Sequence, residues 1–414
     1  MYADAHLKRV NFPRLYANGD FVAVAAGVAG VLGVALARGL RFTDVDVYHR
    51  EALAFWAGGH RLPAEYPILA MVPFSLTLPP AGIDYAWAFS FGMLGLFLVE
   101  WIAVAHMAGR RAGIAYVVYL LVGGFGVILS RYDLVPALVT VAAIAAAERK
   151  RWPIAYVLLG LGVLLKIYPG VLLPVFLIQQ VRSGSSPPKA ALSALWFGLT
   201  VAAGVVASIA LAGSHWLDPV RYAIERPVQV ESVPATVLSL ASLLGWPAAF
   251  DHTFNSFNIT GPGDRAVSAL FSALFVAGSL LVLYRQATGR LTLRQACLGI
   301  LCLLLATSKV LSTQYLIWVL PLVAIALELD TVWILICVLT TLIFPGLYFL
   351  TALIDQAPEA TAKAYSWPFL VAIATRNALL VAATVRVLMG TKFETSLRLT
   401  ARPGSAQSAA HETH

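Results

Sequence analysis

The sequence predicts an all-α protein that crosses a membrane many times. Of its 414 residues, 59% are hydrophobic and only 12% are charged, and the mean hydropathy is +0.79. A soluble protein of this composition has too few polar residues to cover its apolar surface, so lipid is the expected solvent for most of the chain. The apolar residues are grouped in long uncharged runs between short polar segments, which is typical of a polytopic helical bundle.

Twelve apolar runs mark the expected transmembrane helices. Several are shorter than the roughly 20 residues of a straight span, and flanking Trp, Lys and Arg side chains can make up part of that length. The second and the last run each contain one charged residue near the middle of the span, Glu100 and Arg376. We expect these two either to pair with one another or to line a cavity. The runs lie at residues 21–37, 85–107, 112–130, 134–147, 152–165, 167–181, 190–213, 266–284, 295–308, 313–327, 331–354 and 364–388.

The basic residues indicate how the chain crosses the membrane. With twelve spans and the N-terminus inside, most of the 29 lysines and arginines fall in inner loops, in agreement with the positive-inside rule. The apolar segment 64–83 is interrupted by prolines, and counting it as a further span would move basic clusters outside. We therefore expect 64–83 to be a broken hairpin or re-entrant segment on the outer face.

This topology divides the chain into a cytoplasmic segment at 1–20, a transmembrane domain at 21–390 and a disordered cytoplasmic tail at 391–414. The run 21–37 is not followed by a convincing cleavage site, so we expect an uncleaved first span. The unusual loops, among them 41–83 and 214–264, gather on the outer side. A functional site is expected there, with 214–264 as a candidate lid that carries His215 and His252.

Other function classes fit the sequence less well. The net charge of +8 comes from basic clusters between apolar runs, which membrane topology explains without nucleic acid. Cys297, Cys302 and Cys337 lie within apolar runs and are expected to be core residues, not a disulfide framework. No internal repeat with paired broken helices, as in many secondary transporters, is visible.

Two carboxylates in the first outer loop are the leading candidates for chemistry. Asp44 and Asp46 are two residues apart, and in an extended loop both would point toward one substrate or one divalent ion. We expect an amphipathic helix to begin at Asp46 and to end at Gly58-Gly59, with its apolar face on the bilayer. The alternative for Asp46 is that it only caps this helix.

Five segments carry a resemblance to a known family. TDVDVYHREALAFWAGG at 43–59 and EYPILA at 65–70 resemble the first outer loop of the GT-C superfamily of membrane glycosyltransferases. More narrowly, they resemble the polyprenyl-phosphate-mannose-dependent mannosyltransferases of glycosyltransferase family 87, and the loop is also similar to that of GPI mannosyltransferase I. SRYDLVPALV at 130–139, GLGVLLKIYPGVLLP at 160–174 and STQYLIWVLP at 312–321 resemble family 87 segments in the same order. YPILA is one residue shorter than the corresponding YTPLLA of the eukaryotic enzyme.

The resemblance implies a GT-C fold and an inverting transfer. A mannosyl residue would move from polyprenyl-phosphate-mannose to a glycolipid or lipoglycan acceptor on the extracytoplasmic side of a bacterial plasma membrane. It also implies that Asp44 is the catalytic base, with Asp46 at a motif position that is not always acidic in the family. A carboxylate in that place takes the acceptor proton as the glycosidic bond forms. The alternatives are a lipid-linked sugar transporter or flippase, and a transferase that uses another polyprenyl-phosphate sugar.

The departing lipid phosphate needs cations at the membrane edge. Arg131, Lys166 and Lys309 each lie at the outward end of a predicted span, and Arg41 and Arg221 are further candidates. Arg131 is favoured because a guanidinium binds phosphate with two parallel hydrogen bonds, although Asp133 is a local partner for it. For each cation the alternative is snorkelling to lipid headgroups.

Polar and aromatic side chains at the same level are candidates for binding sugar. They share polar tips and flat apolar faces, and anchoring at the membrane interface is the alternative for each tyrosine. Two nearby carboxylates are a weak metal signal, so we expect no cofactor and no essential metal. The sugar-binding candidates are Tyr48, His49, Tyr66, Tyr168, Gln314 and Tyr315.

Overall fold

The computed structural model describes residues 24–30, 33, 43–59, 62–78, 83–124, 126–348 and 366–390. The N-terminal segment, most of the predicted first span, Arg41 and the tail from residue 391 lie outside the described residues. Predictions that concern those parts are therefore not compared with the structure.

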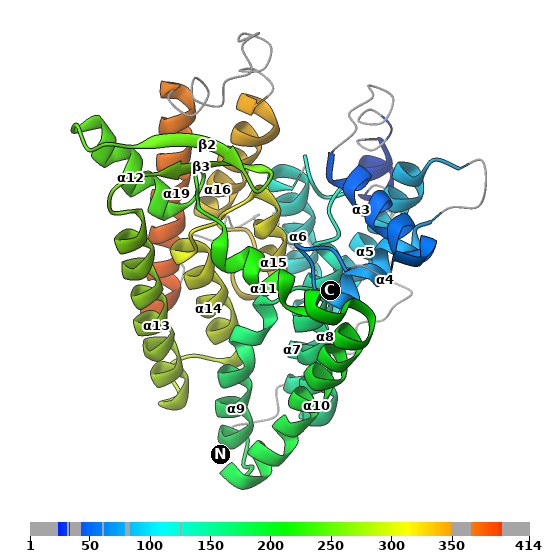
Figure 1. The fold of residues 1–414 in the computed structure, drawn as a ribbon. Helices are drawn as coiled ribbons and strands as arrows, with labels where there is room; N and C mark the ends of the chain where they lie inside the picture. Colours follow the sequence, from blue (N-terminus) through cyan, green and yellow to red (C-terminus); the bar gives the residue numbers. More distant parts are fainter. Residues whose placement is uncertain are drawn as a thin grey trace, which may run out of the picture.

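Helices make up most of the described chain, as predicted (Figure 1). Four of them are long and apolar enough to cross a membrane: α5, α10 with the turns that follow it, α13 and α19. The others are shorter, so the count of twelve spans stays a prediction. The bundle helices are α5 (Tyr85–Ala108), α6 (Arg110–Gly123), α7 (Leu134–Glu148), α8 (Trp152–Leu165), α9 (Leu173–Arg182), α10 (Pro187–Ala212), α13 (Asp264–Ala287), α14 (Leu293–Thr307), α15 (Leu316–Leu327), α16 (Thr331–Thr341) and α19 (Trp367–Met389).

The centre of the bundle is α15. Every residue from Leu316 to Ile325 is buried, because α15 packs against α5, α6, α7 and α14 on different sides. A helix that is apolar all round must be surrounded in this way. Its first turn, which includes Trp318, is thereby fixed at one end of the bundle.

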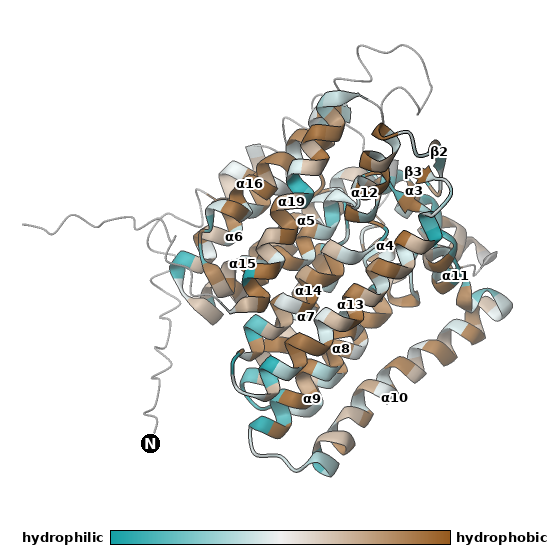
Figure 2. Cartoon of the chain, turned by 90° about the vertical axis from the view of Figure 1, so that its left-hand side faces the viewer, coloured by the Kyte–Doolittle hydropathy of each residue, from teal (hydrophilic) through white to brown (hydrophobic). Residues whose placement is uncertain are grey.

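The long helix α10 runs obliquely along the outside of the bundle (Figure 2). Of its residues only Ala190, Gly204 and Ser208 are buried, whereas leucines such as Leu195 and Leu199 are exposed. Exposed leucines on a helix of this length suit contact with lipid.

A small sheet departs from the all-α prediction. It lies in the loop predicted at 214–264, with strand order β1-β3-β2 and antiparallel pairing throughout. A two-residue turn, Phe254-Asn255, joins β2 to β3, and both residues have positive φ, as a type I′ hairpin turn requires. The sheet and α12 lie beside the upper ends of α16 and α19 (Figure 1). The elements of this loop are α11 (Asp218–Glu225), β1 (Val228–Gln229), α12 (Val233–Leu243), β2 (Ala249–Thr253) and β3 (Ser256–Thr260).

The first outer loop contains α3 (Thr43–Ala54), a π-helical turn (Phe55–Gly59), a 3-10 turn (Ile68–Ala70) and α4 (Met71–Leu76). The helix starts at Thr43 and not at Asp46, so Asp44 and Asp46 both lie in its first turn. Successive residues of a helix are about 100° apart, so two residues separated by two point to different sides. The expected extended loop is therefore wrong, whereas the expectation that both carboxylates face one substrate stays a prediction. The short helical pieces at 68–76 fit a broken segment, and the contact of α3 with the bilayer surface stays a prediction.

The two mid-span charges do not pair with one another. The Glu100 carboxylate accepts a hydrogen bond from the Tyr116 hydroxyl (2.7 Å) within the bundle. Arg376 instead contacts Glu231, which lies two residues after the end of β1 in the loop 214–264. Each buried charge therefore has its own partner in a different part of the molecule.

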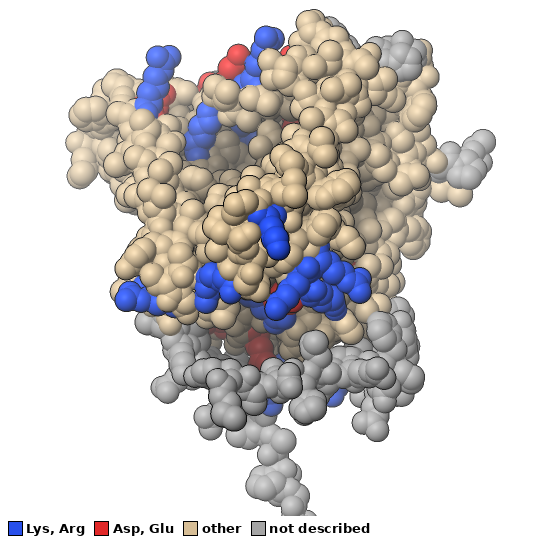
Figure 3. All heavy atoms as spheres, turned by 90° about the horizontal axis from the view of Figure 1, so that it is seen from below, with Lys and Arg blue, Asp and Glu red and all other residues tan. Residues whose placement is uncertain are grey.

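The turns at one end of the bundle are basic and are tied together. Arg294 bonds the Glu148 carboxylate (Nη2 to Oε2, 2.8 Å), Arg182 bonds the Leu291 carbonyl (3.2 Å) and Arg285 bonds the Met389 carbonyl (2.9 Å). Seen from the lower end of Figure 1, lysines and arginines form a band across the molecule (Figure 3). These turns join α7 to α8, α9 to α10, and α13 to α14. The opposite ends of the same helices therefore lie at the other end of the bundle.

Candidate active site

A polar cavity of about 760 Å³ lies at the end of the bundle opposite the basic turns. It is bounded by α3, by the turn before α7, by the residues after α8 and by the segment before α15. Residues of α11 and of the β2–β3 hairpin line it as well, so the outer loop 214–264 contributes a wall. The lining holds as many carboxylates as lysines and arginines, namely Asp44, Asp46, Glu65, Asp133 and Glu231 against Arg50, Arg131, Lys166, Arg226 and Lys309.

Asp44 forms an ion pair with Arg131 at this cavity. The pair joins Asp44 Oδ1 to Arg131 Nη1, and both side chains are partly open, at 24% and 17% exposure. Burial disfavours the charged guanidinium, but attraction to Asp44 and to neighbouring groups outweighs it and raises the pKa of Arg131. Asp46 also lines the cavity but is exposed and forms no ion pair with a described residue. The structure therefore distinguishes the two acidic residues that the sequence placed together.

Lys166 and Asp133 form a second ion pair, more deeply buried. Helices α7 and α8 are antiparallel neighbours, so Asp133 before α7 and Lys166 after α8 meet (Nζ to Oδ1, 2.6 Å). The indole of Trp318 donates to the same carboxylate oxygen (2.6 Å). Burial lowers the pKa of the Lys166 ammonium, and Asp133 opposes that effect. Asp133 is thus the partner of Lys166, and the suggested local pair with Arg131 is not formed.

Three aromatic rings form a stack beside Lys166. Trp318 lies between Tyr168 (ring centroids 4.3 Å apart, 5° between planes) and Tyr315 (4.0 Å, 23°). The Lys166 Nζ is 5.0 Å from the centre of the Trp318 ring and 4.9 Å from that of Tyr132. Cation–π contacts of this kind contribute on the order of 1 kcal/mol each when desolvated. Lys166 is consequently held in place by its surroundings.

Two predicted tyrosines of the first outer loop belong to a buried aromatic cluster. Tyr48 stacks on Phe74 (4.3 Å, 13°) and meets Tyr66 edge-on (5.8 Å, 73°). Both tyrosines line the cavity although they are almost fully buried. His49 lies on another side of α3, where it stacks on Tyr85 (4.3 Å, 9°), and it is not a lining residue. The prediction that His49 contacts substrate does not fit this placement.

Arg226 and Lys309 lie on the wall that the outer loop provides. Lys309 donates to the Ile224 carbonyl (2.6 Å), and neither cation forms an ion pair with a carboxylate of the described residues. The Arg226 Nε is buried and has no hydrogen-bond partner there. Burial, and then the positive charge of Arg226, lower the pKa of the Lys309 ammonium. Two cations that influence one another and that pair with no carboxylate of the described residues are suited to bind an anion.

The tip of the β2–β3 hairpin forms part of the cavity wall. Tyr222 of α11 donates to the Phe254 carbonyl (3.0 Å), and its ring lies edge-on to Phe254 (5.1 Å). Asn255 donates to Glu65 (3.3 Å), which links the hairpin to the first outer loop. All four residues line the cavity.

The remaining candidates lie in different places. Gln314 lines the cavity and contacts Ser312. Arg221 is 62% exposed and near Asp218 (3.9 Å), and it does not line the cavity. Arg41 lies outside the described residues. Within the described ranges, no three His, Cys, Asp or Glu side chains converge to hold a metal ion, so the question of an essential metal stays open to experiment.

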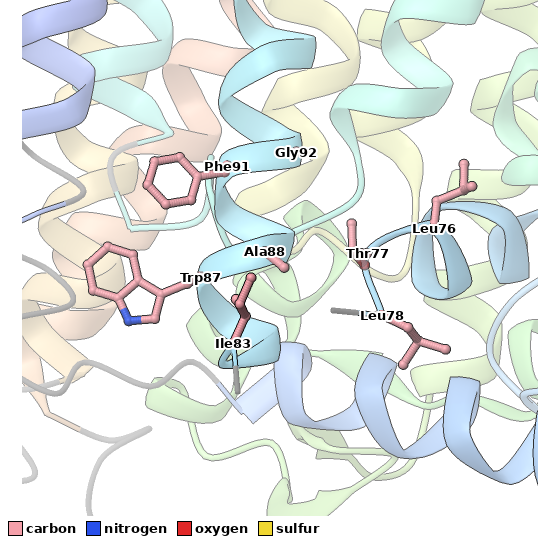
Figure 4. A pocket seen from close by; sticks show the side chains of 8 residues that line it. All are labelled: Leu76, Thr77, Leu78, Ile83, Trp87, Ala88, Phe91 and Gly92. Carbon is pink, nitrogen blue, oxygen red and sulfur yellow. The ribbon is translucent and has the colours of Figure 1, made fainter. Parts of the chain in front are cut away.

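A second cavity is apolar and separate from these charges. It has a volume of about 420 Å³ and lies between the end of α4 and the first turns of α5 (Figure 4). Trp87 and Phe91 stack on one another there (5.9 Å, 25°), and no lining residue is titratable. Its lining residues are Leu76, Thr77, Leu78, Ile83, Trp87, Ala88, Phe91 and Gly92.

Several lining residues were missed from the sequence. Trp318 stood within the quoted segment STQYLIWVLP, but its position inside an apolar run indicated a core residue. Arg226 and Glu231 flank a proline-containing stretch, RPVQVE, of the outer loop and had no distinguishing spacing. The available signal was three charges within seven residues, Glu225, Arg226 and Glu231, in a chain with few charges, since charges near apolar spans are costly.

The chain matches glycosyltransferase family 87 over residues 65–313, which is more than half of its length. The chain belongs to glycosyltransferase family 87. The matched range includes Arg131, Lys166, Arg226 and Lys309 and begins after Asp44. No curated protein and no solved structure matches the chain. Family membership and the four long apolar helices identify a membrane glycosyltransferase.

Proposed function

We propose that this protein is an inverting mannosyltransferase that uses polyprenyl-phosphate-mannose as donor and a glycolipid or lipoglycan as acceptor. The reaction takes place on the extracytoplasmic side of the plasma membrane. Asp44 accepts the proton of the acceptor hydroxyl while the new glycosidic bond forms and the bond to the lipid phosphate breaks. A β-linked donor then gives an α-mannoside.

The observation that carries this proposal is the Asp44–Arg131 ion pair at the edge of a polar cavity. The pair engages Asp44 Oδ1, so Oδ2 is left to accept a proton. A general base must reach the hydroxyl it deprotonates, and the 24% exposure of Asp44 provides that access. Arg131 brings a positive charge next to the same point, which suits an oxygen atom that gains negative charge.

Arg226 and Lys309 are the proposed site for the donor phosphate. They lack carboxylate partners among the described residues, whereas Lys166 is already engaged by Asp133 and surrounded by rings. The guanidinium and the ammonium together neutralise a lipid phosphate as it becomes the leaving group. Lys166 then has a positioning role: together with Asp133 it holds Trp318 and the aromatic stack that lines the cavity.

The proposal is tested with purified protein, radiolabelled polyprenyl-phosphate-mannose and a panel of glycolipid acceptors, with analysis of the products. We expect a new α-mannoside and release of polyprenyl phosphate in equal amounts. Parallel incubations contain the glucose and arabinose analogues of the donor. Faster transfer from one of them than from the mannose donor would show that the donor sugar is not mannose. Movement of labelled lipid across vesicles without any new glycosidic bond would identify a flippase instead.

A further inference from the structure

The helix α12 of the outer loop is packed on one face and exposed on the other. On the packed face, Ala235 and Leu238 share an apolar cluster with Val228 of β1, Ile259 of β3 and Val267 of α13. Burial of these side chains explains why the helix sits on the sheet and on the first turn of α13. It does not explain the opposite face, which is apolar as well.

The exposed face of α12 carries large apolar side chains at helical spacing. Val237, Leu240 and Leu244 follow one another three and four residues apart, and Leu244 is 91% exposed. No charged residue lies between Glu231 and Asp251. A contiguous exposed apolar patch marks a surface that is covered by a partner or by a membrane.

The turn that ends α12 presents this face in one fixed arrangement. Gly245 has a positive φ of 91°, and its N–H donates to the Ser242 carbonyl (3.0 Å), while the Trp246 N–H donates to the Ala241 carbonyl (3.1 Å). These two bonds form a Schellman motif. The Trp246 indole donates to the Pro262 carbonyl (2.6 Å), yet the ring is 53% exposed.

The helix α13 indicates what covers the exposed face. α12 contacts α13 and α19, which are both long and apolar enough to cross a membrane (Figure 1). Pro262, the partner of Trp246, lies just before the first turn of α13, which carries Asp264 and Arg265. Charged residues and tryptophan are typical of the headgroup level, whereas Leu270 further along α13 is exposed and apolar. α12 therefore lies where headgroups meet acyl chains.

We propose that α12 is an interfacial helix whose exposed face rests in the lipid leaflet at the cavity end of the bundle. Such a helix buries its apolar face about 5–10 Å into the boundary between headgroups and acyl chains. Lipid is favoured over a second copy of the chain, because the face continues the exposed apolar surface of α13 and ends in a tryptophan. The face consists of Val237, Leu240, Leu243, Leu244 and Trp246.

The strand β1 ties α12 to the cations proposed for the donor phosphate. Leu238 of α12 shares its cluster with Val228, which lies two residues after Arg226. The Gln229 N–H donates to the Lys309 carbonyl (2.9 Å). A lipid phosphate lies at the headgroup level, so the contact of α12 with lipid holds both cations at the height of the phosphate. This consequence alone rests on the proposed function.

The lipid contact is tested by the depth of single spin labels in liposomes. Leu240→Cys and Leu244→Cys of the full-length protein are labelled with a nitroxide, and Thr253→Cys on exposed β2 is the control. The native cysteines are buried, so they add little background. We expect oxygen, which concentrates in lipid, to relax the labels at 240 and 244 more than a water-soluble nickel chelate does. The control label should show the reverse order.

Two results would overturn the proposal. Relaxation of the labels at 240 and 244 by the nickel chelate as strongly as at 253 would place α12 in water. Protection of these labels from both reagents, with spin–spin broadening, would show that a second copy covers the face.

The consequence for the donor is tested with the double variant Leu240→Asp and Leu244→Asp. Two charges on the face expel it from lipid, so the donor KM in liposomes is expected to rise by at least about tenfold. In detergent with a short-chain donor no bilayer sets the height, and KM should stay within about twofold of the wild-type value, which a misfolded variant would not do. Thr253→Asp is the matched control and should keep the wild-type KM in liposomes.

The outcomes separate the lipid contact from the proposed function. Labels that report insertion, with an unchanged donor KM in the double variant, would keep the interfacial helix and remove its role in donor binding. Insertion without any transfer by the wild type would keep the helix and remove the transferase.

Discussion

Asp44 and Arg131 place a carboxylate and a guanidinium side by side at the polar cavity, where both side chains are partly exposed. Asp44 is in the first turn of α3, where the N-terminal end of the helix favours a negative charge. Arg131 precedes α7, and its guanidinium is paired with Asp44. In the proposed reaction, Asp44 takes the acceptor proton beside the Arg131 guanidinium, and the departing phosphate carries away the negative charge.

Lys309 gives the reaction a predicted dependence on pH. Its pKa is lowered by burial and by Arg226, so its positive charge is lost at a lower pH than in a free lysine. The donor phosphate binds the charged form, and the donor KM is expected to rise as pH increases through that pKa. Lys309→Arg stays charged and should move this rise to higher pH. The measurement is donor KM between pH 6 and about 10.5.

The control for this prediction is Lys189→Arg, because Lys189 is exposed at the start of α10 near the basic end. It should leave the pH profile of donor KM unchanged. An identical alkaline rise in the wild type and in Lys309→Arg would show that another group controls donor binding.

At the scale of elements, the packing of α8 against α10 depends on glycine. A Cβ at Gly160 would lie 2.9 Å from Thr200 Cβ and 3.2 Å from the Phe197 carbonyl oxygen, so Gly160→Ala pushes the two helices apart. We expect it to cost about 1–3 kcal/mol of stability. Gly198→Ala on α10 is the control, since nothing lies within 4 Å of its Cβ and it should be neutral or stabilising by about 0.5–1 kcal/mol.

The measurement for this pair is the apparent unfolding temperature in detergent. A Gly160→Ala protein as stable as Gly198→Ala would contradict the observed approach of α8 and α10. Because Lys166 directly follows α8, the same substitution should also shift Lys166 and the aromatic rings that it contacts in the cavity.

The bounds of the long helices could be predicted from the sequence. Apolar runs at 85–107 and 134–147 correspond to α5 at Tyr85–Ala108 and α7 at Leu134–Glu148, because charges and glycines mark helix ends in a membrane protein. The sequence predicts a helix start at Asp46, whereas α3 begins at Thr43. The two cannot be told apart from the sequence, because Asp is suited both to the cap and to the first turn of a helix. The sheet in 214–264 was missed because its strands are short and lack a clear alternation.

The candidate site was predicted in part. Arg131, Lys166 and Lys309, expected at the outward ends of predicted spans, line one cavity together with Asp44 of the first loop and Tyr168. Which charges pair with each other could not be predicted, because pairing depends on which helices are neighbours. Asp133 has Arg131 two residues away, yet the α7–α8 hairpin brings Lys166 to it. The stacking of Trp318 between Tyr168 and Tyr315 could not be predicted for the same reason, because it depends on which segments are neighbours in the fold.

At the scale of the whole molecule, basic turns and the cavity lie at opposite ends of the bundle. The positive-inside rule then predicts that the cavity opens on the extracytoplasmic side. Cys297, Cys302 and Cys337 are buried, so the background for cysteine labelling is low. A membrane-impermeant maleimide should label Thr253→Cys in intact cells and Arg149→Cys only after permeabilisation. The reverse pattern would place the cavity in the cytoplasm.

The most direct measurement is single-turnover transfer by Asp44→Asn with labelled polyprenyl-phosphate-mannose, alongside Asp46→Asn as the control from the same helical turn. General-base catalysis contributes about 10²–10⁴ in rate, so Asp44→Asn should lose that factor in the chemical step while its donor affinity is kept within about threefold. Asp46→Asn, which is exposed and unpaired among the described residues, should stay within about threefold of the wild-type rate. Transfer by Asp44→Asn within about tenfold of the wild-type rate would contradict the role of Asp44 as the base.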